Sequence, residues 1–149
     1  MSGKIMETAL ARAAAQRGMS AASIVDKSHV LQYVPFNSQL KYSLSLIQES
    51  GRHTVVLVGA PDILIKHAAL SDHDTQALEK QIHELALSGE RVLGLASKEV
   101  HHHEEFSLSK DFYPAALSFD GLITFRDPIR RGSKTSLSVS VWPVSRLLS

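Results

Sequence analysis

The chain has 149 residues, of which 44% are hydrophobic and 21% are charged, as in ordinary globular proteins. This length predicts one domain with a sizeable core, and the net charge of +1 argues against nucleic acid or an anionic membrane surface as a partner. The absence of cysteine excludes disulfides, thiolate metal sites and cysteine nucleophiles. No apolar run approaches the roughly 18 residues of a membrane span, and the N-terminus has no apolar signal core. Taken by itself, the chain is expected to be soluble and intracellular.

The first part of the chain predicts one helix and then several strands. Residues 6–16 are rich in alanine and other good helix formers. Residues 29–34 are apolar and β-branched, and Pro35 is expected to end them as a strand. Apolar residues then alternate with serines over 42–46, which indicates a half-buried strand. The turn sequence "ESGRH" separates it from the apolar run 54–58, so the two strands are expected to form a hairpin.

The second part of the chain mixes helices with further strands. Pro61 suits the first turn of a short helix, and Ser71 with Asp74 has the spacing of a capping box before a helix over about 74–88. Residues 91–97 and 117–125 have the composition of strands, while 101–110 is polar and irregular. Without a regular βαβ repeat, this order predicts an α+β fold with an antiparallel sheet flanked by helices.

Five short motifs occur in order along the chain. They are "METAL" on the first helix, "PFNSQLK" at a strand entrance, "VGAPDIL" at a strand-to-helix turn, "SGERVLGLA" and "FDGLITFRDPIR". This series resembles the nucleotide-binding domain of cation-transporting P-type ATPases, whose corresponding motifs are similar to TE-x-AL, F-x-S-x-x-K-x-x-S, K-G-A-P-E, G-x-R-x-L-x-x-A and D-P-x-R. Each motif alone is weak, but the order makes the resemblance specific over about residues 4–130.

The resemblance implies a nucleotide site and a role for each of its residues. The ring of Phe36 would stack on adenine, a contact worth about 1–3 kcal/mol in nucleic-acid binders. Lys41 would supply positive charge beside the adenine or the phosphates, and Glu7 would accept a hydrogen bond from the adenine amino group. Three further residues complete the implied site: Arg91 on the phosphates, Leu93 lining the base pocket, and Gly59 allowing the backbone to come close to the nucleotide.

Without the resemblance, the same residues have simpler interpretations. Phe36 would be a core residue, whereas Lys41 and Arg91 would be solvated charges. Glu7 would favourably occupy the first turn of a helix whatever its ligand. The sequence therefore leaves both interpretations open for each residue.

The chain also departs from the family pattern. Val58 stands where the family turn usually has lysine, which removes a cation from the pocket and puts nucleotide affinity or preference in doubt. The aspartate motif D-K-T-G-T and the magnesium-holding motifs T-G-D and G-D-x-x-N-D do not occur in the chain. Residues 1–130 are thus expected to be a nucleotide-binding domain that ends at a hinge with Asp127, Pro128 and Arg130. Residues 131–149 are expected to be a poorly placed tail that does not resemble the family.

These features together predict ATP binding without turnover, with no catalytic residue in the chain and with Mg²⁺ entering only with the nucleotide. By resemblance, the partners would be the phosphorylation and transmembrane domains of a pump, and the chain would be a monomeric cytoplasmic domain of that membrane protein.

One alternative is a non-catalytic protein-interaction module that keeps the fold and has lost nucleotide binding. A metal site at His101–His103 in "HHHEE" is less favoured, because consecutive side chains point apart. The sequence does not indicate which cation is carried.

Overall fold

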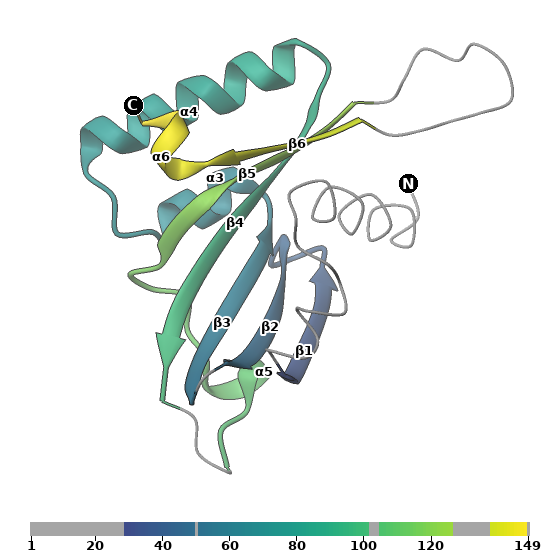
Figure 1. Cartoon of the computed structure of the whole chain (residues 1–149), viewed down its shortest axis with the longest axis vertical. Helices are drawn as coiled ribbons and strands as arrows, with labels where there is room; N and C mark the ends of the chain where they lie inside the picture. Colours follow the sequence, from purple (N-terminus) through teal and green to yellow (C-terminus); the bar gives the residue numbers. More distant parts are fainter. Residues whose placement is uncertain (1–28, 50, 102–104, 127–137, 149) are drawn as a thin grey trace, which may run out of the picture.

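The fold is a six-stranded antiparallel sheet with helices packed on one of its faces (Figure 1). A computed structural model describes residues 29–49, 51–101, 105–126 and 138–148. The elements in chain order are β1 (His29–Asn37), β2 (Tyr42–Glu49), β3 (Arg52–Gly59), α3 (Pro61–Lys66), α4 (Asp72–Leu87), β4 (Arg91–Val100), α5 (Leu108–Asp111), β5 (Ser118–Arg126), β6 (Ser138–Pro143) and α6 (Val144–Leu147).

The strands follow one another in the sheet in the order of the sequence, from β1 at one edge to β6 at the other. Every neighbouring pair is antiparallel. The expected hairpin is confirmed, because β2 and β3 pair without a break from Glu49 opposite Arg52 to Tyr42 opposite Gly59. The α+β fold with an antiparallel sheet that the sequence predicted is therefore the observed one.

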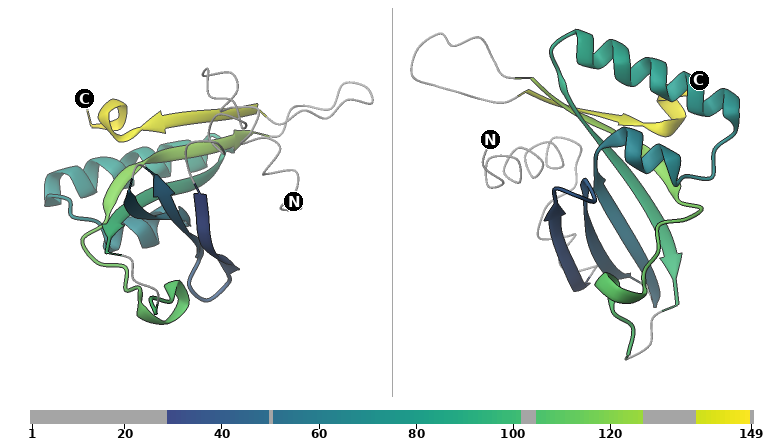
Figure 2. Two further views of the ribbon diagram at one scale, coloured as in Figure 1. Left: turned by 60° about the horizontal axis from the view of Figure 1, so that its bottom comes forward. Right: turned by 180° about the vertical axis from the view of Figure 1, so that it is seen from behind.

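One face of the sheet, called the inner face here, carries the hydrophobic core. Side chains directly opposite each other in an antiparallel pair share a face, so Leu44, Leu57 and Ala96 form one row across β2, β3 and β4. These side chains are at most 5% exposed. Each described helix contributes to the same cluster, through Leu64 and Ile65 of α3, Leu78 of α4, Leu108 of α5 and Leu147 of α6. Figure 2 shows the helices α3 and α4 gathered on this side of the sheet.

The opposite face, called the outer face here, has a different composition. Its rows include Ser43, Val58 and Leu95, and next to them Ser45, Val56 and Ser97. All six side chains are half-buried. Across β2, β3 and β4 this face combines short polar and apolar side chains. The described helices pack in the core cluster on the inner face instead.

The two helices α3 and α4 begin as their sequences indicate. Pro61 occupies the first turn of α3, where its missing N–H breaks no hydrogen bond. The Ser71 hydroxyl accepts a hydrogen bond of 3.1 Å from the Asp74 amide at the start of α4, which is the expected cap. The helix itself begins at Asp72, two residues earlier than expected.

Two expectations, one about a strand and one about an irregular segment, differ from the structure. Strand β1 continues past Pro35 to Asn37, with a register shift against β2 between Val34 and Asn37. An edge strand tolerates proline there because no further strand needs its N–H. Within the expected irregular segment 101–110, a short helix α5 begins at Leu108. The side chain of Leu108 is only 1% exposed, and its packing in the core holds this segment against the sheet.

The C-terminal residues 138–148 also differ from the expected poorly placed tail. Strand β6 pairs with β5 over its whole length, and Leu147 of α6 is 7% exposed in the core cluster. The Trp142 indole N–H donates a 3.1 Å hydrogen bond to the Thr124 hydroxyl of β5. Apolar residues alternate with serines in this segment, as is typical of a strand, but nothing local in the sequence indicated that β5 would be its partner.

Candidate functional site

The turn between β1 and β2 is organised by a single side chain, that of Asn37. Its Oδ1 accepts hydrogen bonds from the amides of Gln39, at 2.7 Å, and Leu40, at 3.1 Å. Its backbone carbonyl accepts a further bond of 2.7 Å from the Lys41 amide. Asparagine favours turns through such local bonds to the backbone, so the sequence "NSQLK" closes a compact turn at the end of β1.

Lys41 and Gly59 meet at the base of this turn. The Lys41 carbonyl accepts a hydrogen bond of 2.9 Å from the Ala60 amide, and Tyr42 pairs with Gly59 in the sheet. A Cβ on Gly59 would overlap the Lys41 carbonyl oxygen and would lie 2.5 Å from the Tyr42 Cα. Only glycine therefore permits this approach of the two backbones. The motifs "PFNSQLK" and "VGAPDIL" are brought together here.

Phe36 lies immediately before this turn and is 59% exposed. The simpler interpretation of Phe36 as a core residue is therefore wrong for the described part of the chain. A phenylalanine ring that is more than half exposed, at the start of the turn that also holds the exposed Lys41, is available to a flat ligand. This exposure is necessary for the stacking role that the resemblance implies.

Val58 occupies the outer face beside the turn. It stands opposite Ser43 and Leu95 in the sheet, and the Ser43 hydroxyl makes a long hydrogen bond of 3.4 Å to the Val58 carbonyl. Leu93 lies two residues before Leu95 and is half-buried on the same face. The lining of this part of the outer face is thus apolar with hydroxyl groups.

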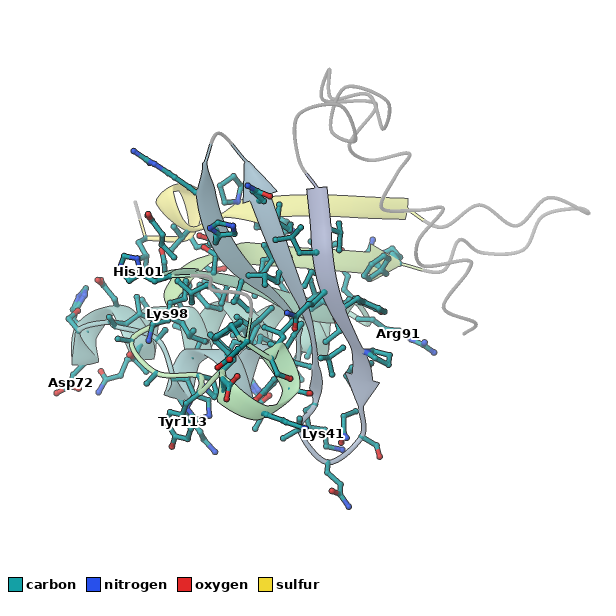
Figure 3. The ribbon with its side chains drawn as sticks, turned by 90° about the horizontal axis from the view of Figure 1, so that it is seen from below. Lys41, Asp72, Arg91, Lys98, His101 and Tyr113 are labelled. Carbon is teal, nitrogen blue, oxygen red and sulfur yellow. The ribbon has the colours of Figure 1, made fainter. Side chains whose placement is uncertain are left out.

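Arg91 lies farther along β4 and is exposed. Gly94 stands opposite Gly59, so the Arg91 backbone is about 10 Å along the strand from the level of Gly59. Figure 3 shows Lys41 at the turn between β1 and β2 and Arg91 reaching away from the sheet. The two cations would contact different parts of an elongated ligand, and the structure does not bring Arg91 against the turn.

The core side chain nearest the turn is Tyr42, which is 6% exposed. Burial raises the pKa of the Tyr42 hydroxyl above its ordinary value, and the neighbouring Tyr113 acts in the same direction. The neutral phenol is thus the form favoured in the folded chain. Tyr42 supports the turn from the inner face.

A family model described as "P-type ATPase, cytoplasmic domain N" matches residues 1–132. The chain belongs to this family. The motifs that meet at Lys41 and Gly59 lie within the matched range, as do Phe36, Arg91 and Leu93. The domain N fold therefore holds these residues in the arrangement described above.

This domain N chain is similar to parts of several longer ATPases. It is 30% identical over 138 residues to a cation-transporting ATPase of a Synechocystis species, covering 86% of this chain and 15% of the relative. It is 28% identical to a probable plasma membrane ATPase of Dictyostelium discoideum, over 74% of this chain and 10% of the relative. It is 26% identical to a sodium/potassium-transporting ATPase alpha-A subunit of Artemia franciscana, over 80% of this chain and 12% of the relative. The chain spans about a tenth to a seventh of these proteins.

Several residues singled out in the sequence lie outside the described ranges. They are Glu7, the hinge residues Asp127, Pro128 and Arg130, and most of the histidine run, of which His101 is described and exposed. In the described ranges, no three acidic or histidine side chains are grouped to hold a metal ion. No helix there is long and apolar enough to cross a membrane.

No role was expected for Asn37, although it lies inside the motif "PFNSQLK". Its signal was present, because asparagine before a short polar run is typical of a turn. What the sequence did not show is that the Asn37 turn holds the backbone of Lys41.

Proposed function

We propose that this domain N binds ATP by its adenosine, and that the site lies on the outer face where the β1–β2 turn meets Gly59. In the intact protein it would hold the nucleotide for transfer of the γ-phosphate to an aspartate on a domain that this chain does not include. The observation that carries the proposal is the junction of Lys41 with Gly59, together with the exposed ring of Phe36 immediately before the same turn.

Each described residue has a part to play in this proposal. The exposed Phe36 ring offers a stacking surface for adenine, and the half-buried Leu93 contributes an apolar wall. Gly59 has no side chain, so its backbone can lie directly against the backbone of Lys41 and Tyr42. The lysine lies at the turn between β1 and β2, whereas the arginine lies farther along the sheet on β4. A ligand with an aromatic base at one end and a charged chain at the other therefore suits the arrangement better than a compact anion.

The affinity expected for ATP is modest. One stacked base with two or three polar contacts leaves on the order of 4–5 kcal/mol of net binding free energy, which corresponds to roughly millimolar affinity. Val58 supplies no cation, so the phosphates contribute through Lys41 and Arg91. Magnesium would accompany the phosphates, because the described residues include no cluster of three or more acidic or histidine side chains that could hold it.

Turnover is not part of the proposal for this chain. Transfer of a phosphoryl group requires an acceptor and a bound metal ion in line with the γ-phosphate. The aspartate motif of the family does not occur in the sequence, so the acceptor would come from another domain. ATP binding without hydrolysis is therefore the activity proposed for this chain alone.

A titration with ATP followed by ¹H–¹⁵N NMR spectroscopy tests this proposal. We expect shifts at the amides of residues 36–41, Gly59 and Leu93, and we expect Phe36→Ala to weaken binding about tenfold, as stacking worth about 1–3 kcal/mol requires. Tyr33→Ala is the matched control because Tyr33 lies on the same strand and is 60% exposed, against 59% for Phe36. Equal weakening by both substitutions, or no shifts up to about 10 mM ATP, would contradict the proposal.

The second candidate, a protein-interaction module, is favoured by Val58 and by the apolar exposure of β1. Val30 and Tyr33 are 63% and 60% exposed on this edge strand. In that case ATP would cause no shifts, and a protein partner would broaden the resonances of β1. The same spectra thus distinguish the two functions.

A further inference from the structure

Lys41 has a backbone conformation that is unusual for a lysine. Its φ is 71°, in the left-handed region, and among the described residues other than glycine only Ala116 shares this feature. Side chains with a Cβ are disfavoured in this region, where glycine or asparagine is usual. A lysine therefore remains here against the local preference of the backbone, and such strain is concentrated at binding sites.

The backbone on both sides of Lys41 is tied by hydrogen bonds. Before it, Asn37 receives three amide bonds, two at its side-chain oxygen and one at its carbonyl. After it, the Lys41 carbonyl is bonded to the Ala60 amide and is packed against Gly59. The turn and the strand-to-helix junction thus fix Lys41 from two directions, while its side chain remains exposed.

We propose that Asn37 is a positioning residue of the nucleotide site, which acts by holding Lys41 in its left-handed conformation. This inference rests on the proposed function. The Asn37 oxygen stabilises the turn because without it the Gln39 and Leu40 amides lose their acceptor. The turn fixes the direction in which the Lys41 side chain projects from the backbone. It thereby fixes the place where the ammonium group contacts the ligand. Asn37 itself does not touch the nucleotide.

The first test needs no nucleotide and follows hydrogen exchange at the Ala60 amide, whose acceptor is the Lys41 carbonyl. We expect Asn37→Ala to accelerate this exchange about threefold to tenfold, because the turn loses two exposed hydrogen bonds. Asn37→Asp keeps the oxygen acceptor, and we expect it to restore exchange to within about twofold of the unaltered chain. Unchanged exchange in Asn37→Ala would overturn the proposal.

The second test measures ATP affinity in a cycle of Asn37→Ala, Lys41→Gln and the double variant. We expect Asn37→Ala to weaken ATP binding about threefold to tenfold when Lys41 is present. In the Lys41→Gln background we expect less than about twofold further weakening, because a residue that acts through Lys41 has nothing left to position. Equal weakening in both backgrounds would mean that Asn37 acts on folding alone and would overturn its positioning role.

Ser71→Ala is the matched control for both tests. The Ser71 hydroxyl also accepts a backbone amide, at 3.1 Å, and its loss removes one cap at the start of α4. Its neighbour Asp72 lies well apart from Lys41 in Figure 3. We expect lower stability with no change in Ala60 exchange or ATP affinity. If the unaltered chain bound no ATP, both the proposed function and the role of Asn37 would be contradicted. If the unaltered chain bound ATP and Asn37→Ala weakened binding equally with and without Lys41, only the role of Asn37 would be contradicted.

Discussion

The two faces of the sheet are made by the same strands and serve different purposes. On the inner face, Leu57 and Ala96 are fully buried and belong to the core cluster that also includes residues of the helices. On the outer face, Val58 and Leu95 lie one residue away along the same strands and are only half-buried. Across β2, β3 and β4, most of the free energy of folding should therefore reside in the inner face. Substitutions at adjacent positions of one strand can separate the two.

The largest expected difference between the faces is in stability. Leu57→Ala should lower the free energy of unfolding by about 2–5 kcal/mol, because it leaves a cavity in a fully buried site. Its neighbour Val58→Ala should lower it by about 1 kcal/mol, since the side chain is only half-buried and smaller. Denaturation by urea measures both values. Losses of equal size would show that the outer face is as tightly packed as the inner face.

The next expected effect is on binding and concerns the missing cation. Val58→Lys should strengthen ATP binding about fivefold, which is about 1 kcal/mol and is typical of one exposed ionic contact. Its effect on adenosine should be negligible, because adenosine has no phosphates. Calorimetric titration with the two ligands makes the comparison.

Val56→Lys is the control for this gain of binding. Val56 is on the same face of the same strand, opposite Ser45 and Ser97, and lies farther from the junction at Gly59. It should leave the affinity for ATP unchanged. A gain of the same size from both lysines would indicate a general effect of charge rather than a site beside the turn.

The smallest expected effect is on the pH dependence of stability and concerns Tyr42, which faces inward below the turn. Its pKa is raised by burial and by Tyr113, so the unfolded chain releases the phenol proton more readily than the folded chain does. The stabilising contribution is complete below about pH 10, where the phenol is neutral in both states, and is lost as the pH rises above that value. Tyr42→Phe should therefore make the decline in stability above pH 10 shallower.

Urea denaturation between pH 8 and about 11 checks this effect. Tyr33→Phe is its control, since Tyr33 is 60% exposed, and it should leave the pH dependence as it is. If Tyr42→Phe also leaves the decline unchanged, the phenol of Tyr42 does not titrate differently in the folded and unfolded chains.

The fold could be predicted from local patterns, whereas part of the site could not. Alternation over 42–46 and the turn before 54–58 indicated the hairpin, because register and alternation are local properties. The docking of Leu147 into the core depends on contacts that are remote in sequence, so β6 was not expected in the sheet. The family resemblance indicated Phe36 and Lys41 as site residues. It did not indicate the left-handed backbone of Lys41, which depends on a junction between two separate motifs.

The most direct test of the site is the intermolecular nuclear Overhauser effect between ATP and the isotope-labelled chain. The adenine H2 and H8 protons should show contacts to the Phe36 ring and to no ring on the inner face. Weaker contacts should reach Leu93, whereas Tyr33 should show none. Contacts from adenine to Tyr33 or Tyr113 without Phe36, or none at about 10 mM ATP, would contradict a nucleotide site on the outer face beside the turn.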